Sequence, residues 1–351
     1  MKVLQLIDSL EAGGAERVAV NTANILLGLI EKSYLCVTRL EGPLKKEIDA
    51  QVEYLFVNKQ TTFDTKAFKQ LLIFIKKEKI THIHAHGTSF FWATLLKIRH
   101  PSLKLIWHEH HGRRVEMKAK DHKMLVFCSY FFDQILTVNN TLKDWCVKNL
   151  KAKNVTYLPN FVPDSLFQFN NNTQKELAIV CLANLKPPKD HLNLLQAFKT
   201  IQASYPEWKL WLIGKDENDA YSAKLKSYVQ KVDLDSSVLF LGVQQNVHQW
   251  LQRASIGVLS SNMEGLPMAL LEYGAASLPV VVTEAGYCKQ VVGLYGKVVP
   301  IGDTIALKES LIDYIEQKEL RVAHGKLFQD QIVNKYSNHS IVKQLLEIYN
   351  A

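Results

Sequence analysis

The chain has few cysteines, no long apolar run and no secretion signal. Its 351 residues include five cysteines, an odd number with no C-x-x-C pair, which excludes a disulfide framework and a cysteine-based structural zinc site. The apolar runs 25–30 and 71–75 are far shorter than the roughly 20 residues that a membrane-spanning helix needs. The N-terminal segment has a single lysine and lacks the apolar core and the cleavage site of a signal peptide. These absences predict reduced thiols and a cytoplasmic protein.

Basic charge is concentrated in one half of the chain. The formal net charge is +8, and residues 1–165 carry 24 basic against 16 acidic side chains, whereas the remaining residues carry 18 of each. This excess favours an anionic partner, either a diphosphate-bearing substrate or an anionic membrane surface. A generally basic proteome is the alternative explanation. No block of lysine and arginine and no aromatic ladder is present, so we expect no nucleic-acid partner.

Short β-rich runs alternate with helical patterns along the chain. The expected strands are 2–8, 33–38, 81–86, 103–107, 135–138, 177–183, 208–213, 238–241, 256–259 and 278–283, and the expected helices include 15–28, 65–79 and 337–349. The alternation predicts α/β domains with doubly wound parallel sheets, in which ligands bind at the carboxyl ends of strands. The polar stretch 168–175 is the expected linker. We therefore expect domains at 1–165 and 166–335 and a C-terminal helix within 336–351.

The most informative segment is E-G-L-P-M-A-L-L-E at residues 264–272. Its two carboxylates, Glu264 and Glu272, are eight residues apart, and Pro267 suits the first turn of a helix. The segment predicts a loop that runs into a helix N-terminus, where unpaired N–H groups bind phosphate or sugar oxygens. Glu264 is expected in the loop, and Glu272 about two turns into the helix. Taken alone, the pattern also fits a surface loop followed by an ordinary amphipathic helix.

Four motifs in order make the chain resemble the retaining glycosyltransferases of family 4, which have the GT-B fold. They are G-G-A-E-R at 13–17, L-P-N at 158–160, L-A-N-L-K-P-P-K-D at 182–190, and the segment 264–300. The resemblance implies two Rossmann-like domains that face each other across a cleft, with the last helix packed on the first domain. It implies transfer of a sugar from a nucleotide sugar, such as UDP-GlcNAc, UDP-GalNAc or a UDP-hexose, to a lipid-linked or polysaccharide acceptor. It also implies retention of configuration with no metal ion or other cofactor.

The resemblance places most donor-binding residues in the second domain. Glu264 is the candidate for binding donor sugar hydroxyls, Glu272 for the ribose, and Lys189 for the leaving diphosphate. This chain has Asn184 where the family usually has arginine, and we expect Lys186 to supply the missing charge. The other donor-binding candidates are Gly13, Gly14, Gly265, Leu266, Pro267 and Met268. Solvated loop charges are the alternative for the two lysines, and a tight strand–helix turn is the alternative for the two glycines.

Histidines gather at the ends of two expected strands in the first domain. They are His82, His84 and His86 at one strand, and His108, His110 and His111 at the next. Alternating histidines are compatible with a metal, but no convergent acidic set and no i,i+4 histidine pair support one, so we predict none. Through the resemblance, His110 is the candidate catalytic residue that reaches the transferred sugar. His86 and His111 are candidates on the acceptor side, and Glu109 is interpreted as structural.

Two other functions stay open on the sequence. A sugar-nucleotide epimerase of the same fold would isomerise the donor without an acceptor. A non-catalytic assembly subunit would bind the donor without turnover, although the intact set of Glu264, Glu272 and Lys189 argues against this.

A membrane-facing surface is predicted in the first domain. The basic candidates are Lys66, Lys69, Lys76, Lys77, Lys79, Arg113, Arg114, Lys118, Lys120 and Lys123. The five basic residues from Arg113 to Lys123 flank four apolar side chains, Met117, Met124, Leu125 and Phe127. These apolar side chains are expected to enter the interface of an anionic leaflet. A place in the hydrophobic core is the alternative for these four side chains. We predict reversible attachment to the inner face of the cytoplasmic membrane.

Overall fold

A computed structural model describes residues 1–167 and 173–351, apart from the side chains of Ala119 and Lys120. Most of the predicted linker at 168–175 therefore lies outside the described residues. The chain divides into two compact units, the first formed by residues 1–161 and 341–351 and the second by residues 162–340. The first unit thus ends four residues before the predicted boundary at 165 and regains the last eleven residues of the chain.

The first unit is built on a sheet of seven strands in the order β3-β2-β1-β4-β5-β6-β7. The strands are β1 (Lys2–Ser9), β2 (Lys32–Leu40), β3 (Glu53–Phe56), β4 (His82–His86), β5 (Lys104–Glu109), β6 (Gln134–Thr137) and β7 (Val155–Tyr157). Every neighbouring pair is parallel, which confirms the predicted sheet type. The order reverses between β1 and β4, and the loops after these strands form the switch point at which ligands bind in such sheets.

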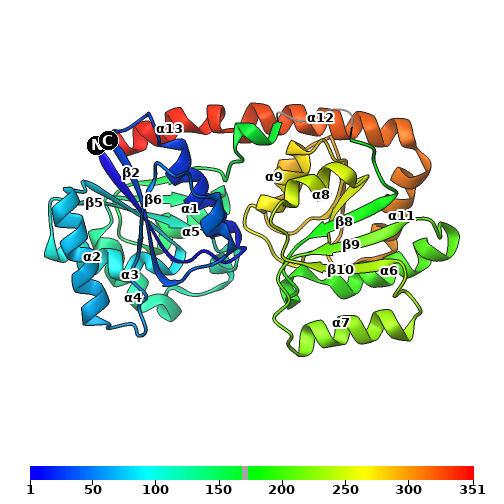
Figure 1. The fold of residues 1–351 in the computed structure, drawn as a ribbon, viewed down its shortest axis with the longest axis horizontal. Coiled ribbons are helices and arrows are strands. Elements are labelled where there is room, and N and C mark those ends of the chain that lie inside the picture. The colour runs from blue at the N-terminus through cyan, green and yellow to red at the C-terminus, as the bar shows by residue number, and fades with distance from the viewer. Residues whose placement is uncertain (168–172) are drawn as a thin grey trace. The chain divides into compact units, whose positions relative to one another are not determined.

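Helices cover both faces of this sheet (Figure 1). They are α1 (Gly14–Ile25), α2 (Thr65–Glu78), α3 (Phe90–Arg99), α4 (Lys123–Cys128), α5 (Asn140–Asn149) and α13 (Asn338–Asn350). Hydrophobic cores lie on both faces of the sheet. Alternate residues of β1 point into one face or the other, because successive side chains of a strand point to opposite faces. Leu4 and Leu6 pack with α2 to α5, whereas Val3 packs with α13 and Ile7 with α1. The C-terminal helix α13 is therefore part of the core of the first unit.

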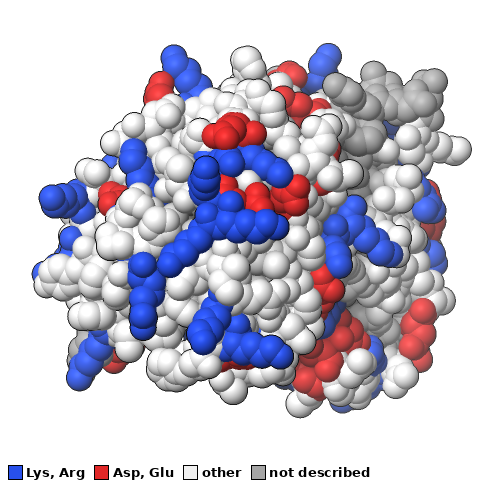
Figure 2. Space-filling view, turned by 60° about the vertical axis from the view of Figure 1, so that its left-hand side comes forward, with Lys and Arg blue, Asp and Glu red and all other residues white. Residues whose placement is uncertain are grey.

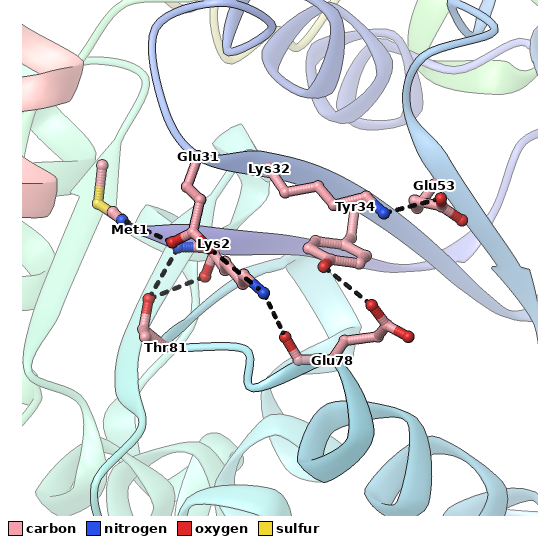
Figure 3. Close-up of polar contacts among 8 residues, drawn as sticks. All are labelled: Met1, Lys2, Glu31, Lys32, Tyr34, Glu53, Glu78 and Thr81. Carbon is pink, nitrogen blue, oxygen red and sulfur yellow. Dashed lines mark hydrogen bonds and ion pairs between the residues drawn. The ribbon is translucent and has the colours of Figure 1, made fainter.

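Polar contacts close the amino-terminal edge of this sheet, on the side away from the switch point (Figure 3). Lys2 Nζ donates to the Glu78 carbonyl oxygen at 3.0 Å. The Tyr34 hydroxyl donates to the Glu78 carboxylate at 3.2 Å. Lys32 pairs with Glu53 at 2.9 Å. These contacts anchor the end of α2 to β1 and β2 and join the starts of β2 and β3.

The second unit has a sheet of six parallel strands in the order β10-β9-β8-β11-β12-β13. The strands are β8 (Ala178–Leu182), β9 (Lys209–Ile213), β10 (Val238–Gly242), β11 (Ile256–Leu259), β12 (Val280–Thr283) and β13 (Lys297–Val299). The helices are α6 (His191–Ser204), α7 (Ala220–Lys231), α8 (Val247–Arg253), α9 (Met268–Ala275), α10 (Cys288–Val292), α11 (Thr304–Glu316) and α12 (Lys318–Tyr336). The strand order reverses between β8 and β11, so the loops after these two strands form the switch point of this unit.

Tyr273 holds α9 against this sheet. Its hydroxyl accepts from the Leu182 N–H at 2.6 Å and donates to the Val258 carbonyl at 3.1 Å, so it joins β8 and β11. A side chain at Gly257 would lie 2.8 Å from the Tyr273 ring, which explains the glycine in the middle of β11. The two strands of the switch point are thus fixed to the helix that follows it.

All five cysteines are buried, Cys36, Cys128 and Cys146 in the first unit and Cys181 and Cys288 in the second. Burial raises the pKa of each thiol above its ordinary value. Since the thiolate is the reactive form, these side chains serve as small apolar core residues.

Candidate active site

An ion pair between Lys189 and Glu264 lies at the switch point of the second unit. Lys189 ends the 3-10 turn η7 (Pro187–Lys189) after β8, and Glu264 lies in the loop after β11. Lys189 Nζ is 2.6 Å from Glu264 Oε1, and the two side chains are 19% and 7% exposed. The Ser261 hydroxyl donates to the same carboxylate oxygen at 2.6 Å. Glu264, predicted to bind sugar hydroxyls, and Lys189, predicted to bind the diphosphate, therefore form one preorganised ion pair.

The loops that carry this pair are also joined through their backbones. The Ser260 hydroxyl donates to the Lys189 carbonyl at 3.0 Å, and the Asn262 N–H donates to the Pro188 carbonyl at 2.8 Å. Sequence reasoning missed Ser260, Ser261 and Asn262, because short polar residues after a strand are typical of any loop.

A turn after β12 holds the other side of the E-G-L-P loop. The Tyr287 N–H donates to the Gly265 carbonyl at 3.1 Å. Gly286 has φ +55°, and a side chain there would lie 1.9 Å from the Glu264 carbonyl oxygen. Only glycine allows this close approach, so Gly286 sets the position of the Glu264 backbone.

Helix α9 begins at Met268, directly after the extended residue Pro267, so the predicted change from loop to helix is present. Its first N–H groups have no side-chain cap. Glu272 is 6% exposed among apolar neighbours on the helix. It lies one turn into α9; the predicted depth of two turns was wrong, because residues 265–267 stay in the loop.

The neighbouring candidates Asn184 and Lys186 have different surroundings. Asn184 Oδ1 accepts from the Lys215 N–H at 2.9 Å, so this side chain joins the loops after β8 and β9. Lys186 is exposed and precedes η7 with an extended backbone. Because asparagine is uncharged, Lys186 is the one of these two residues that places a positive charge near the switch point.

In the first unit, Gly13 and Gly14 form the start of α1 after β1. Gly13 is extended and Gly14 is the first helical residue. The Glu16 side chain folds back over Gly13, since a side chain at Gly13 would lie 2.1 Å from Glu16 Oε2. Ser9 Oγ donates to Glu16 Oε1 at 3.1 Å. A carboxylate therefore already lies at the helix N-terminus that the sequence assigns to an anion, and a diphosphate there would have to displace it.

Four histidines form a ladder on β4 and at the end of β5, in which His84, His86 and His108 are buried and His110 is half-buried. His86 Nδ1 lies 3.0 Å from His110 Nε2, and His84 Nε2 lies 3.3 Å from His108 Nδ1. The rings of His84 and His86 are stacked with centroids 4.4 Å apart, and those of His108 and His110 are tilted by 35° with centroids 4.1 Å apart. Both nitrogens of His86 are occupied, since Nε2 bonds to Gln5 Oε1 at 2.9 Å. His86 is thus buried behind His110, so its predicted acceptor-side role could only be indirect.

Burial keeps these rings neutral. It lowers the pKa of His84 to about 3, and burial together with the neighbouring imidazoles lowers the pKa of His86, His108 and His110 well below its ordinary value. Donor atoms of His84, His86 and His108 lie within 4.8 Å of one another, a spacing that a metal ion could draw together. The absence of a metal from the reaction stays a prediction.

Glu109 positions the segment that carries His111. Its carboxylate is fully buried, accepts from the His111 N–H at 2.8 Å and pairs with Arg114 Nε at 2.5 Å. His111 itself is exposed, and its Nε2 would lie 3.3 Å from a side chain at Gly87. These contacts fit the interpretation of Glu109 as structural and leave His111 accessible at the carboxyl end of β5.

The switch point of the first unit also holds a polar cluster around Asp8 that was not predicted from the sequence. Asp8, at the end of β1, accepts from Thr38 at 2.5 Å, from Thr88 at 2.6 Å and from Lys59 at 3.1 Å. Although burial acts to raise the pKa of Asp8, these hydrogen bonds lower it overall. The buried Lys59 lies 51 residues from Asp8 in sequence, and no local pattern links them.

Comparisons with known proteins agree with this architecture. A curated relative from Escherichia coli, UDP-Gal:alpha-D-GlcNAc-diphosphoundecaprenol alpha-1,3-galactosyltransferase, is 24% identical over 96% of this chain and 93% of its own length. N-acetyl-alpha-D-glucosaminyl L-malate synthase of Bacillus anthracis is 25% identical over 68% of this chain and 66% of its own. The crystal structure of Anabaena Alr3699/HepE in complex with UDP and glucose matches with a TM-score of 0.84 at 16% identity, over 100% of this chain and 99% of that one.

Two adjoining family models match the chain. "Glycosyltransferase Family 4" covers residues 12–166, and "Glycosyl transferases group 1" covers residues 163–327. Together they span both parallel-sheet units. The chain therefore belongs to the family 4 glycosyltransferases and has their GT-B fold.

Proposed function

We propose that this protein is a retaining glycosyltransferase that moves a sugar from a UDP-sugar to a hydroxyl group of a lipid-linked or polysaccharide acceptor, without a metal ion. The observation that carries the proposal is the Lys189–Glu264 pair beside the uncapped N-terminus of α9. A cation and a helix N-terminus without a side-chain cap at one switch point suit a diphosphate. The E. coli relative uses UDP-Gal and a diphosphoundecaprenol-linked acceptor by its name, which favours this substrate class.

The reaction breaks the bond between the anomeric carbon and the diphosphate oxygen. A new bond forms from that carbon to the acceptor oxygen, and the acceptor proton passes to the departing diphosphate. Lys189 and the N–H groups of α9 would stabilise the charge that grows on the leaving group, and exposed Lys186 would add to this field. His110 would contact the 6-position of the transferred sugar, and Glu272 would accept from the ribose.

Donor binding would exchange the partners of Lys189. In the free protein Lys189 is neutralised by Glu264. With donor bound, Glu264 would accept from sugar hydroxyls while Lys189 turns to the diphosphate. One anionic partner of the lysine thus replaces another, which avoids leaving a partly buried charge unpaired.

A turnover assay tests the proposal. Purified protein is incubated with a panel of UDP-sugars, alone and with lipid-diphosphate-linked acceptors, with and without EDTA. We expect UDP release that depends on acceptor, a product with the donor's anomeric configuration by NMR, and no effect of EDTA. An isomerised donor in the absence of acceptor would identify an epimerase, and donor binding without any turnover would identify a non-catalytic subunit. Loss of activity in EDTA that a divalent ion restores would disprove the metal-free mechanism.

We also propose that the first unit docks on anionic membrane. No described helix is long and apolar enough to cross a bilayer. Met124 and Phe127 of α4 are 52% and 57% exposed, and Met117 is 39% exposed, whereas Leu125 lies in the core, so its predicted membrane contact was wrong. Exposed apolar side chains beside lysines are typical of interfacial segments.

Exposed basic side chains lie on two elements of the first unit. Exposed lysines lie on and just after α2 and before and at the start of α4, namely Lys66, Lys69, Lys76, Lys77, Lys79, Lys118 and Lys123. Arg114 is committed to Glu109, and the Lys120 side chain lies outside the described part of the chain. Figure 2 turns the left-hand side of Figure 1 forward and shows more Lys and Arg than Asp and Glu on that side, with the two kinds of side chain interspersed. Such a face suits anionic headgroups.

A further inference from the structure

The histidine ladder continues into a chain of hydrogen bonds that ends on the C-terminal helix. Gln5 Nε2 donates to the Tyr349 hydroxyl at 3.3 Å, and this hydroxyl lies 2.7 Å from His84 Nδ1. His82 Nε2 bonds to the Tyr349 carbonyl at 3.0 Å and so holds the backbone of α13 in place. Gln5 and Tyr349 are both fully buried. The chain therefore runs from His110 through His86, Gln5, Tyr349 and His84 to His108.

The Gln5 carbonyl oxygen fixes the protons on one branch. Because this oxygen can only accept, His86 Nε2 carries the proton of that hydrogen bond. A neutral His86 then accepts at Nδ1, so His110 Nε2 carries a proton and donates to it. His110 Nδ1 is left as a bare lone pair. This nitrogen is buried and without a hydrogen-bond partner in the structure.

On the other branch, which runs from Gln5 through Tyr349 and His84 to His108, the unpartnered nitrogen carries a proton. The Tyr349 hydroxyl accepts from Gln5 and directs its own proton to His84 Nδ1. His84 Nε2 then donates to His108 Nδ1, so His108 Nε2 carries a proton. That atom is also buried and unpartnered. The rings of His108 and His110, 4.1 Å apart and tilted by 35°, thus carry one N–H donor and one lone pair that have no partner in the structure.

We propose that Gln5 and Tyr349 are positioning residues that fix the tautomers of His110 and His108, so that His110 Nδ1 accepts a hydrogen bond from a hydroxyl of the transferred sugar. This inference rests on the proposed function for the identity of the hydroxyl, whereas the tautomers follow from the orientation of the Gln5 amide, whose nitrogen faces Tyr349 and whose oxygen faces His86. An unpaired buried acceptor is unfavourable, and a sugar hydroxyl would relieve that cost. The C-terminal helix would therefore act on the site through the hydrogen bonds of Tyr349.

The ring geometry favours this network over a metal centre. The hydrogen-bonded partners His84 and His108 are nearly parallel at 17°, and His86 and His110 at 19°. A metal ion lies close to the plane of each imidazole that binds it, whereas His84 and His86 are stacked one above the other. Convergence of three lone pairs on one ion would require at least one of these rings to rotate out of its hydrogen bond.

Nitrogen-15 NMR of the full-length protein, with its histidines assigned by single His→Gln variants, tests the proposal directly. We expect His110 to be protonated on Nε2 and His108 on Nε2, both unchanged between pH 8 and 6. Tyr349→Phe removes only the hydroxyl and should mix the tautomers of His84 and His108, while Gln5→Leu should mix those of His86 and His110. The matched control Tyr336→Phe, at a buried tyrosine of the second unit, should change neither.

Turnover gives the second readout. Tyr349→Phe and Gln5→Leu should each lower kcat about tenfold, the effect of one lost hydrogen bond, with less change in the donor KM. A proton on His110 Nδ1, or unchanged tautomers in Gln5→Leu, would overturn the proposal. So would zinc-induced shifts at His84, His86 and His108, which would identify a metal site. Correct tautomers in a protein that transfers no sugar would instead refute the proposed function and leave the network standing.

Discussion

At the scale of single residues, the Lys189–Glu264 pair makes loss of the lysine doubly costly. Lys189→Ala should lower kcat about 100-fold with a smaller change in donor KM, since leaving-group charge grows in the transition state. It also leaves Glu264, 7% exposed, without its cation, so the melting temperature should fall. Steady-state kinetics and calorimetry measure the two effects. The double variant Lys189→Ala with Glu264→Gln should regain stability but not kcat. If Lys189→Ala changed only the donor KM, Lys189 would contribute to ground-state binding alone.

Glu272 is the residue predicted to bind the ribose. Glu272→Gln keeps the shape of this 6% exposed side chain while removing its charge, and should weaken UDP binding about tenfold or more, because a charge-assisted hydrogen bond contributes about 1.5–3 kcal/mol. Isothermal titration with UDP measures the change. Glu309→Gln, at an exposed carboxylate on α11, is the matched control. Equal affinity in the two variants would remove Glu272 from the donor site.

At the scale of elements, the turn after β12 should control the E-G-L-P loop. Gly286→Ala places a side chain 1.9 Å from the Glu264 carbonyl and forces alanine into a left-handed backbone, so UDP affinity should fall and stability should drop by more than about 1 kcal/mol. Gly302→Ala has a similar φ of +73° but no atom within 4 Å. It should therefore share the backbone strain and keep UDP affinity. Similar UDP affinity in both variants would show that the turn does not position the loop.

The neutral histidine ladder should make the first unit sensitive to acid. Unfolded histidines take up protons near pH 6.5, whereas the folded rings resist protonation, with a pKa of about 3 for His84. The unfolded state thus binds more protons below pH 6.5, and stability should fall from there toward pH 3 by up to about 1.4 kcal/mol per pH unit for each histidine. Urea titrations between pH 8 and 5 test this. A flat stability profile over that range would mean that the rings are protonated in the folded state.

The elements that the sequence predicted and missed differ in burial. The apolar run of β12 was found, because both faces of an inner parallel strand are buried. The edge strands β3, β7 and β13 have three or four residues each, mostly half-buried, and lack such a run. The E-G-L-P loop and α9 were also predicted. The ladder was not, because Tyr349 meets Gln5 across 344 residues, and strand register sets which histidines pair.

At the scale of the whole molecule, membrane docking predicts a dependence on lipid charge. The protein should sediment with vesicles that contain anionic lipid, and binding should weaken as salt rises, because screened charges attract less. Phe127→Glu should abolish binding, whereas Val322→Glu, at a 63% exposed residue of α12, should not. Binding to neutral vesicles, or equal effects of the two variants, would disprove electrostatic docking through α4.

The rate at which the buried cysteines are labelled can report on the opening of each unit separately. Because no thiol is accessible in the folded state, modification by a soluble maleimide can proceed only through molecules that have opened locally or globally. Labelling of Cys36, Cys128 and Cys146 reports on the first unit, and labelling of Cys181 and Cys288 on the second. Peptide mass spectrometry at intervals would therefore time the opening of the two units separately in one wild-type sample, with and without UDP, and show which unit the nucleotide protects.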